Sequence, residues 1–280
     1  MAFAGSRSIL KLSRMLGGWP GRTGEWLHGL VPDWVRAWIS RCTDEHGEPV
    51  PWRVRALAPC NICGGTRFRA AYGPQPLSHS GRLRKCMQCG SLTHQRVLRK
   101  MMASLRRKDF KQARCLQIST DRSIRPAWFG QYEVSVYSGK NSLDIQQIAR
   151  PDASYDIIVC NHVIEHVPDH RRALRELGRI LSDRGFLFVS VPDPARHART
   201  EDWGRPDPAR HGHYREFGPD FADLLTQELP DLSVIEVRAV DDVTGDPDVA
   251  YILTRNRTWY QRARRLPLTS RVHAARPLTA

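Results

Sequence analysis

The 280-residue sequence lacks several features that define whole classes of protein. It has no run of about 18–20 uncharged apolar residues, so no membrane-spanning helix is expected. Its first residues break their apolar run with Arg7, Lys11 and Arg14, a pattern that argues against a cleavable secretory signal. No internal repeat is evident, and 41% hydrophobic residues suffice for a sizeable core. We therefore expect a cytoplasmic protein with one or two compact domains.

Acidic residues are scarce in two segments of the chain. Residues 60–114 hold 13 basic side chains and one acidic side chain, and residues 255–280 hold 7 basic and none acidic. Residues 115–254 hold 15 basic and 23 acidic side chains, so an acidic segment lies between two basic ones. The net charge of +14 is therefore unevenly distributed. The basic segments either bind an anionic partner or dock on the acidic segment.

The seven cysteines include two C-x2-C pairs, CNIC and CMQC, separated by 22 residues. An odd number of cysteines and the lack of a secretory signal argue against a disulfide framework. Two such pairs are typical of a tetrahedral zinc site, and a closed four-thiolate site leaves no open position for catalysis. His79 and His94 are alternative ligands. We expect a structural Zn²⁺ bound by Cys60, Cys63, Cys86 and Cys89.

Aromatic residues are also scarce in the basic stretch that contains the cysteines, whereas residues 1–59 are rich in tryptophan. After the second cysteine pair, apolar residues recur at helical spacing, which predicts a basic amphipathic helix over 93–113. The residues of this stripe are Leu98, Met101, Met102 and Leu105. The basic face of the helix either meets phosphate or carboxylate groups or is solvated. So few aromatic side chains make a poor stacking platform for nucleic acid.

The acidic segment alternates strand-like and helix-like patterns. The runs RCLQIS, YEVSVY, YDIIVCN and GFLFVSVP each suit a buried parallel strand. Between the last two runs we predict a helix with Asp169 as its N-cap and Gly185 as its terminator. A helix beginning at Pro219 and an antiparallel pair of strands follow. The pattern predicts an α/β fold: a doubly wound, mostly parallel Rossmann-like sheet with a C-terminal antiparallel hairpin, preceded by a small zinc ribbon.

Residues 142–193 resemble the central block of class I S-adenosylmethionine-dependent methyltransferases of the type 11 kind. The matching motifs are Asp144-Ile145, PDASYD at 151–156, NHVIEHVPD at 161–169 and LSDRG at 181–185. The stretch HGHYREFGPDFADLL at 211–225, and a four-cysteine ribbon ahead of the domain, are similar to one subgroup of that family. The glycine-rich turn typical of the family after the first strand is missing, and LQISTDRSIRP stands in its place.

These patterns divide the chain into five segments. They are a basic, Trp-rich N-terminal arm at 1–59, the zinc ribbon at 60–92, the basic linker helix at 93–113, a methyltransferase-like domain at 114–254, and a basic tail at 255–280. We expect the tail to form a short helix followed by a disordered stretch.

The resemblance implies that S-adenosylmethionine binds at the carboxyl ends of the strands. Asp144 is expected to accept a hydrogen bond from the adenine amino group, and Ile145 to pack on the ring. The full set expected to contact the cofactor is Ile118, Ser119, Asp121, Asp144, Ile145, Asn161 and His162.

The resemblance further implies an enzyme that transfers a methyl group to an unidentified acceptor, and the basic segments suggest that this acceptor is an anionic small molecule or glycan. His162, His166 and His213 are the candidate bases, and Arg215, in a loop over the mouth of the site, is expected to hold the acceptor. Because the glycine-rich turn is missing, an alternative remains open. In it, the fold is catalytically degenerate and the zinc ribbon binds nucleic acid or another polyanion.

Overall fold

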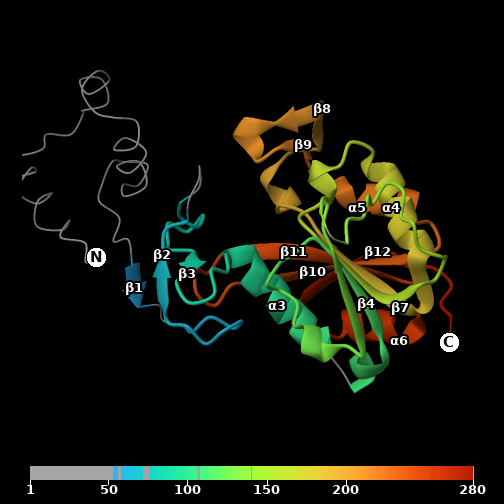
Figure 1. Ribbon diagram of the computed structural model, residues 1–280, viewed down its shortest axis with the longest axis horizontal. Coiled ribbons are helices and arrows are strands. Elements are labelled where there is room, and N and C mark those ends of the chain that lie inside the picture. Colours follow the sequence, from blue (N-terminus) through green and yellow to red (C-terminus); the bar gives the residue numbers. More distant parts are fainter. Residues whose placement is uncertain (1–52, 56–57, 72–75, 106–107, 140, 280) are drawn as a thin grey trace, which may run out of the picture. The chain divides into compact units, whose positions relative to one another are not determined.

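A seven-stranded sheet forms the centre of the structure, a computed structural model that describes residues 53–55, 58–71, 76–105, 108–139 and 141–279 (Figure 1). In spatial order the strands are β12-β10-β11-β7-β6-β4-β5. Their bounds are β4 Arg114–Ile118, β5 Gln131–Ser135, β6 Tyr155–Asn161, β7 Leu181–Ser190, β10 Ser233–Val240, β11 Pro247–Thr254 and β12 Thr269–Ala274. The tryptophan-rich part of the N-terminal arm lies outside the described residues.

Most of the sheet is parallel. Strands β5, β4, β6 and β7 pair in parallel, and β11 pairs antiparallel with both β7 and β10. Because β10 is antiparallel to β11, it runs in the same direction as β7. Five of the seven strands (β4, β5, β6, β7 and β10) therefore share one direction, and the β10–β11 hairpin is antiparallel as predicted. The predicted α/β fold with a C-terminal antiparallel hairpin is confirmed.

Helices cover both faces of the sheet, as alternation along its strands requires. In β6, Ile158 and Cys160 pack with helices α4 (His170–Ile180) and α5 (Phe221–Glu228) on one face. Ile157 and Val159 pack on the other face with α3 (Thr93–Leu105) and α6 (Arg257–Arg264). All seven residues of β6 are buried, which explains the unbroken apolar run in the sequence.

The predicted helix between β6 and β7 is confirmed, but its end differs from our prediction. The Asp169 side chain accepts a hydrogen bond from the backbone N–H of Arg172, so Asp169 is the N-cap of α4. The helix ends at Ile180, and Gly185 lies inside β7 rather than after the helix. A Cβ at Gly185 would lie 1.7 Å from the carbonyl oxygen of Asp156 on β6, so the glycine permits close approach of these two strands.

Residues 53–92, which include the two C-x2-C pairs, are called the cysteine-rich segment below. Helix α3 joins this segment to the sheet. The predicted apolar stripe of this helix is buried against the sheet, as expected. The helix ends at Leu105, and a 3₁₀ helix η1 (Lys108–Gln112) forms part of the remaining predicted span. Two basic residues of α3, Arg96 and Arg99, are buried as well. The basic face is therefore not simply solvated.

The basic C-terminal segment differs from our prediction. After α6, we expected disorder, but β12 pairs antiparallel with β10 and extends the sheet. Trp259 of α6 is 6% exposed, and its ring N–H donates to the carbonyl of Arg184 at 2.9 Å. Pairing and packing therefore hold this segment on the domain.

Two small sheets complete the described fold. In the cysteine-rich segment, β1 (Arg53–Arg55), β2 (Arg67–Arg69) and β3 (Lys85–Cys86) form an antiparallel sheet. Strands β8 (Glu201–Asp207) and β9 (His213–Glu216) pair where we expected a loop. Among the described residues, none of the helices has the length and apolar character needed to cross a membrane.

Candidate functional site

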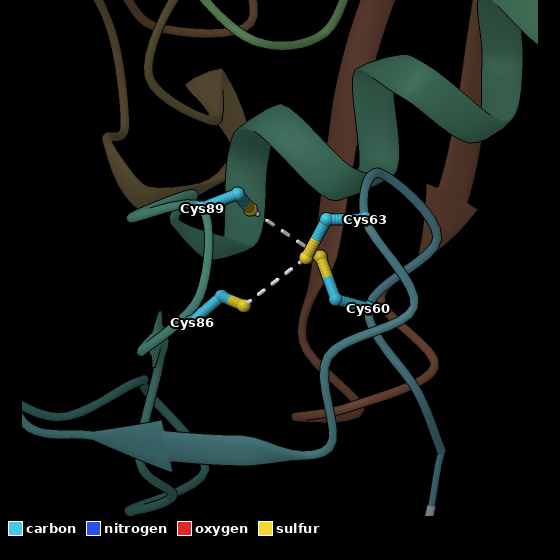
Figure 2. Close-up of side chains that lie close together, drawn as sticks. All are labelled: Cys60, Cys63, Cys86 and Cys89. Carbon is cyan, nitrogen blue, oxygen red and sulfur yellow. Dashed lines mark hydrogen bonds between the residues drawn. The ribbon is translucent and has the colours of Figure 1, made fainter.

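The four predicted metal-ligating cysteines lie together. Figure 2 shows their side chains converging from two loops, with Sγ atoms 3.6 Å apart between Cys63 and Cys86 and 3.8 Å apart between Cys60 and Cys89. In a tetrahedral zinc site with Zn–S bonds of about 2.3 Å, the sulfurs are about 3.8 Å apart. The donor set and its spacing therefore fit a Zn²⁺ ion. Neither His79 nor His94 belongs to this cluster.

Glycines shape the two loops that carry the cysteines. Gly64 and Gly90 have φ values of +78° and +75°, a backbone conformation that favours glycine. In the first loop, the backbone N–H of Gly64 donates to the carbonyl of Cys60 at 2.7 Å. In the second loop, the N–H of Gly90 donates to the carbonyl of Cys86 at 2.9 Å. Each pair of thiols is thus held on one tight turn.

The cysteine-rich segment is tied to the β10–β11 connection by buried polar contacts. The carboxylate of Asp246 accepts hydrogen bonds from the backbone N–H groups of His79 and Ser80, at 2.7 and 3.0 Å. Arg96 and Asp241 form a two-armed ion pair, with N···O distances of 2.9 and 2.7 Å. Both side chains of this pair are almost fully buried. These contacts connect residues more than 140 positions apart.

The carboxyl ends of β4 and β6 meet at the point where ligands bind in doubly wound folds. Ser119 follows β4 with a φ of 62°, and His162 follows β6 with a φ of 51°. Non-glycine residues adopt this region only at a cost, which functional sites often bear. Ser119 thus adopts a left-handed backbone conformation that glycine adopts more readily.

The predicted cofactor residues are distributed over this edge. The Asn161 side-chain amide donates to the Asp121 carboxylate and to the Ser123 hydroxyl, both at 2.9 Å, so two predicted residues are joined across the crevice. Asp144 is exposed, and its carboxylate accepts from the backbone N–H of Gln146.

The two apolar members of the predicted set, Ile118 and Ile145, lie in the hydrophobic core, at 4% and 5% exposed. Ser135 ends β5, the strand beside β4, and its hydroxyl is buried with no hydrogen-bond partner among the described residues. An unsatisfied hydroxyl at this edge fits a hydroxyl-bearing ligand such as a ribose.

A pocket of about 630 Å³ lies beside the ends of β6 and β7. Its walls come from the cysteine-rich segment, the start of α3, the loop after β6, and the β8–β9 region. Seven of the eleven histidines of the chain line it: His79, His94, His162, His166, His197, His211 and His213. All three predicted bases, His162, His166 and His213, are among them.

Burial favours the neutral form of several histidines and carboxyl groups of this pocket. Desolvation, helped by nearby arginines, lowers the pKa of His94 to about 4, and burial beside other histidines does the same for His213. Burial lowers the pKa of His162 well below its ordinary value. It raises the pKa of Glu165 to about 8 and of Asp248 to about 7. Such perturbed groups gathered in one cleft are typical of functional sites.

Glu165 is the most deeply buried of these groups. It lies in the 3₁₀ helix η3 (Ile164–His166), is 0% exposed, and neither carboxylate oxygen has a hydrogen-bond partner in another described residue. His166 follows it in η3, and His213 lies on the adjoining strand β9, with ring centroids 4.6 Å apart. The burial of Glu165 could not be predicted, because a single glutamate in a sequence does not reveal its surroundings.

We had expected Arg215 to hold the acceptor, but its side chain is buried in contacts with the protein itself. It is 1% exposed, and its guanidinium donates to the carbonyls of Ile164, Val167 and Pro168 and to the carboxylate of Asp202. Because those carbonyls lie in and after η3, Arg215 fixes this loop against β9. These contacts hold in place the loop that carries Glu165 and His166.

A repeated pentapeptide was missed in the sequence. Asp-Pro-Ala-Arg-His occurs at 193–197 and again at 207–211. In both copies the aspartate side chain caps a 3₁₀ helix, η4 (Pro194–Arg196) or η5 (Pro208–Arg210), by accepting from the alanine N–H. Both copies contribute an arginine and a histidine to the pocket. The repeat is the signal that points to these residues.

Basic residues of α3 contact other parts of the same domain. Arg96 pairs with Asp241, Lys100 pairs with Asp242, and Arg99 donates to the carbonyls of Arg122 and Ile124. These charges therefore dock on the acidic segment, one of the two readings we gave for the basic stretch. The reading in which α3 grips a polyanion is not favoured.

Comparisons with known proteins relate part of the chain to methyltransferases. Residues 94–227 match a family described as "Methyltransferase domain". Two Mycobacterium tuberculosis proteins, each named "Probable S-adenosylmethionine-dependent methyltransferase", are 37% identical over 94 residues, which is 34% of this chain and 32% of theirs. The match thus spans about a third of the length of these curated relatives.

Among solved structures, the chain resembles a Burkholderia thailandensis 1,6-didemethyltoxoflavin-N1-methyltransferase, with 14% identity and a TM-score of 0.41 over 67% of this chain and 94% of that one. It also resembles an S-adenosylmethionine-dependent methyltransferase from Mesorhizobium loti, with 14% identity and a TM-score of 0.41 over 55% and 94%. Residues 94–227 are thus similar to a methyltransferase domain, and the curated relatives that match part of the chain are named as probable S-adenosylmethionine-dependent methyltransferases.

Proposed function

We propose that this protein is an S-adenosylmethionine-dependent methyltransferase whose acceptor binds in the histidine-lined pocket. The observation that carries the proposal is the position of the pocket. It lies at the carboxyl ends of β6 and β7, and most of its lining residues belong to the stretch that matches a methyltransferase domain. In doubly wound folds this edge is where ligands bind.

The cofactor site in this proposal is the crevice between β4 and β6. Ser119, with its left-handed backbone, and the buried hydroxyl of Ser135 would hold the ribose, and the exposed carboxylate of Asp144 would accept a hydrogen bond from the adenine amino group. Asp121, Asn161 and His162 line the methionine end. Ile118 and Ile145 support this site from the core.

In the reaction, the bound cofactor supplies an electrophilic methyl group. The chain orients the acceptor and excludes water from it. Where the acceptor must lose a proton, a neutral imidazole serves as the base, and His162, His166 and His213 are the candidates. Their lowered pKa values keep them unprotonated near pH 7.

The acceptor in this proposal is an anionic small molecule or glycan, such as a phosphorylated or carboxylated sugar. Arg196 and Arg210 reach the pocket from the two repeated turns, and Arg84 reaches it from the cysteine-rich segment. The Nε of Arg84 is buried with no hydrogen-bond partner among the described residues. A guanidinium with donors to spare suits a carboxylate or phosphate group.

The four-cysteine cluster in this proposal holds a structural Zn²⁺. The ion orders the cysteine-rich segment, which forms one wall of the pocket. It takes no part in chemistry, because four thiolates fill its coordination sphere.

Calorimetric titration with S-adenosylmethionine and S-adenosylhomocysteine tests the cofactor site. We expect micromolar binding that Asp144→Ala weakens by about tenfold or more, since a hydrogen bond to a charged group contributes about 1.5–3 kcal/mol. The control is Asp231→Ala, which removes an exposed carboxylate just before the amino end of β10, far from the carboxyl ends of the strands where the cofactor is proposed to bind. Absence of binding to the folded wild-type protein would refute the proposal.

The acceptor class is tested with cofactor labelled on its methyl group. We expect label to enter compounds from a cell extract that an anion-exchange column retains, and Arg84→Gln to reduce that transfer. Label confined to unretained compounds would contradict an anionic acceptor and leave the methyltransferase proposal standing.

A further inference from the structure

Glu165 is a buried carboxyl group for which the described residues offer no close counter-ion. Both of its oxygens are buried without a hydrogen-bond partner in another described residue, and Nδ1 of the His162 ring lies 3.6 Å from one of them. Burying an ionised carboxylate without a partner costs several kcal/mol. Such a group is either protonated or paired with a cation that binds there.

Two imidazoles complete a cation-binding set around this carboxylate. Glu165, His166 and His213 each offer one ligand atom, and these atoms lie within 4.8 Å of one another. Ligand atoms of a tetrahedral zinc site lie about 3.4 Å apart, given metal–ligand bonds of about 2.1 Å. The three side chains therefore need to converge by roughly 1 Å.

The surroundings of the two histidines also match those of metal ligands. Nδ1 of His213 is buried and has no hydrogen-bond partner among the described residues. The His166 ring is hydrogen-bonded to the backbone of Gly212. A contact of this kind fixes the tautomer and orientation of a metal-ligating histidine.

We propose that Glu165, His166 and His213 form a second metal site, which binds a divalent transition-metal ion such as Zn²⁺. Two histidines and one carboxylate are a ligand set that such ions use when they keep coordination positions open. All three residues line the 630 Å³ pocket, so the open position faces a bound molecule. The proposal goes beyond the proposed function, because metal binding here requires neither the cofactor nor an acceptor.

The fold holds these three ligands together through Arg215. His213 and Arg215 lie two residues apart on β9, so both point to the same, buried face of that strand. Arg215 binds the carbonyls of the η3 loop that carries the other two ligands. This site takes His166 and His213 out of the set of candidate bases and leaves His162.

Equilibrium dialysis of the full chain against micromolar Zn²⁺, followed by metal analysis, tests the proposal. We expect two bound ions in the wild type, one at the cysteines and one here. Glu165→Gln and His213→Gln should each bind one ion. The matched control is His197→Gln, which changes a histidine of the same pocket that contacts Glu216 rather than the proposed ligands and should keep both ions.

Protein produced with Co²⁺ separates the two sites and reports folding. The thiolate-to-cobalt charge-transfer band belongs to the cysteines and should be unchanged in Glu165→Gln, which shows that this variant is folded. The weaker absorption of a Co²⁺ ion bound by nitrogen and oxygen ligands at the second site should be absent from the spectrum of Glu165→Gln. A wild type that binds one ion, or a Glu165→Gln variant that still binds two, would overturn the proposal. Loss of cofactor binding alone would leave it intact.

Discussion

Replacing Asp241 by asparagine tests how strongly the cysteine-rich segment is attached to the sheet. Asp241 and Arg96 are 2% and 1% exposed, and Asp241 also accepts hydrogen bonds from the N–H and hydroxyl of Thr244. Asparagine keeps the shape of the side chain, but its NH₂ group replaces an acceptor and faces a donor. The guanidinium of Arg96 is left with two backbone carbonyls, of Arg84 and Ser91, and no counter-ion.

The expected cost follows from that geometry. Removing one partner of a buried ion pair costs about 3–5 kcal/mol. The two carbonyls that remain place Asp241→Asn at the lower end, about 3 kcal/mol. The neighbouring pair of Lys100 and Asp242 offers a matched control, since it joins the same two elements but is 34% and 54% exposed. Asp242→Asn should cost less than about 1 kcal/mol.

Urea unfolding followed by circular dichroism measures both free energies at neutral pH. The double variant Arg96→Met/Asp241→Leu should recover most of the loss, because it removes the buried charge together with its partner. Equal stability of Asp241→Asn and Asp242→Asn, within about 0.5 kcal/mol, would refute the reasoning.

Three further predictions concern the sheet and its edge. Ser119→Gly should raise the free energy of unfolding by up to about 0.5 kcal/mol, because relief of the left-handed backbone, about 1 kcal/mol, exceeds the added chain entropy; a loss measured by urea unfolding would contradict this. Gly185→Ala should cost about 3 kcal/mol or more, because its Cβ would collide with the Asp156 carbonyl; thermal melting within a degree of wild type would contradict it. Burial alone would raise the pKa of Asp156, but hydrogen bonds from Arg114 and Ser182 outweigh it and hold the pKa below its ordinary value. This carboxylate therefore stabilises the fold above its unfolded pKa, and the contribution is lost as pH falls through the folded pKa. Asp156→Asn should be less stable than wild type at pH 7, and the difference in the free energy of unfolding should shrink below about pH 4. A constant difference across that pH range would count against this prediction.

The central strands were predictable because they are buried on both faces. The run YDIIVCN has no polar face, and β6 has none either. Strand β12 was not predicted because it lies at the edge of the sheet, where none of the side chains of TSRVHA is fully buried. A polar, basic sequence of this kind is also typical of a disordered tail. Strand β8 was missed because Gly204 and Pro206 interrupt it, as an edge hairpin permits.

The candidate site was predictable only in part. The three predicted histidines share one pocket. His162 and His166 lie in one motif, NHVIEHVPD, and β9 brings the ring of His213 into contact with that of His166. Burial of Glu165, by contrast, depends on Arg215 and on elements far along the chain. Arg84 and His79 reach the pocket only because Asp246 and Asp241 anchor the cysteine-rich segment. No local pattern in the sequence records such contacts.

The place of β12 in the sheet has a consequence for biosynthesis. Strand β10 pairs with β11 on one side and with β12 on the other, yet β12 follows all the other strands in the chain. During translation, β10 and β11 therefore emerge before the strand that covers the outer edge of β10. An uncovered strand edge is a template for pairing with other chains. The outer edge of β10 is thus open to pairing with other chains until β12 has been synthesised and has docked on it.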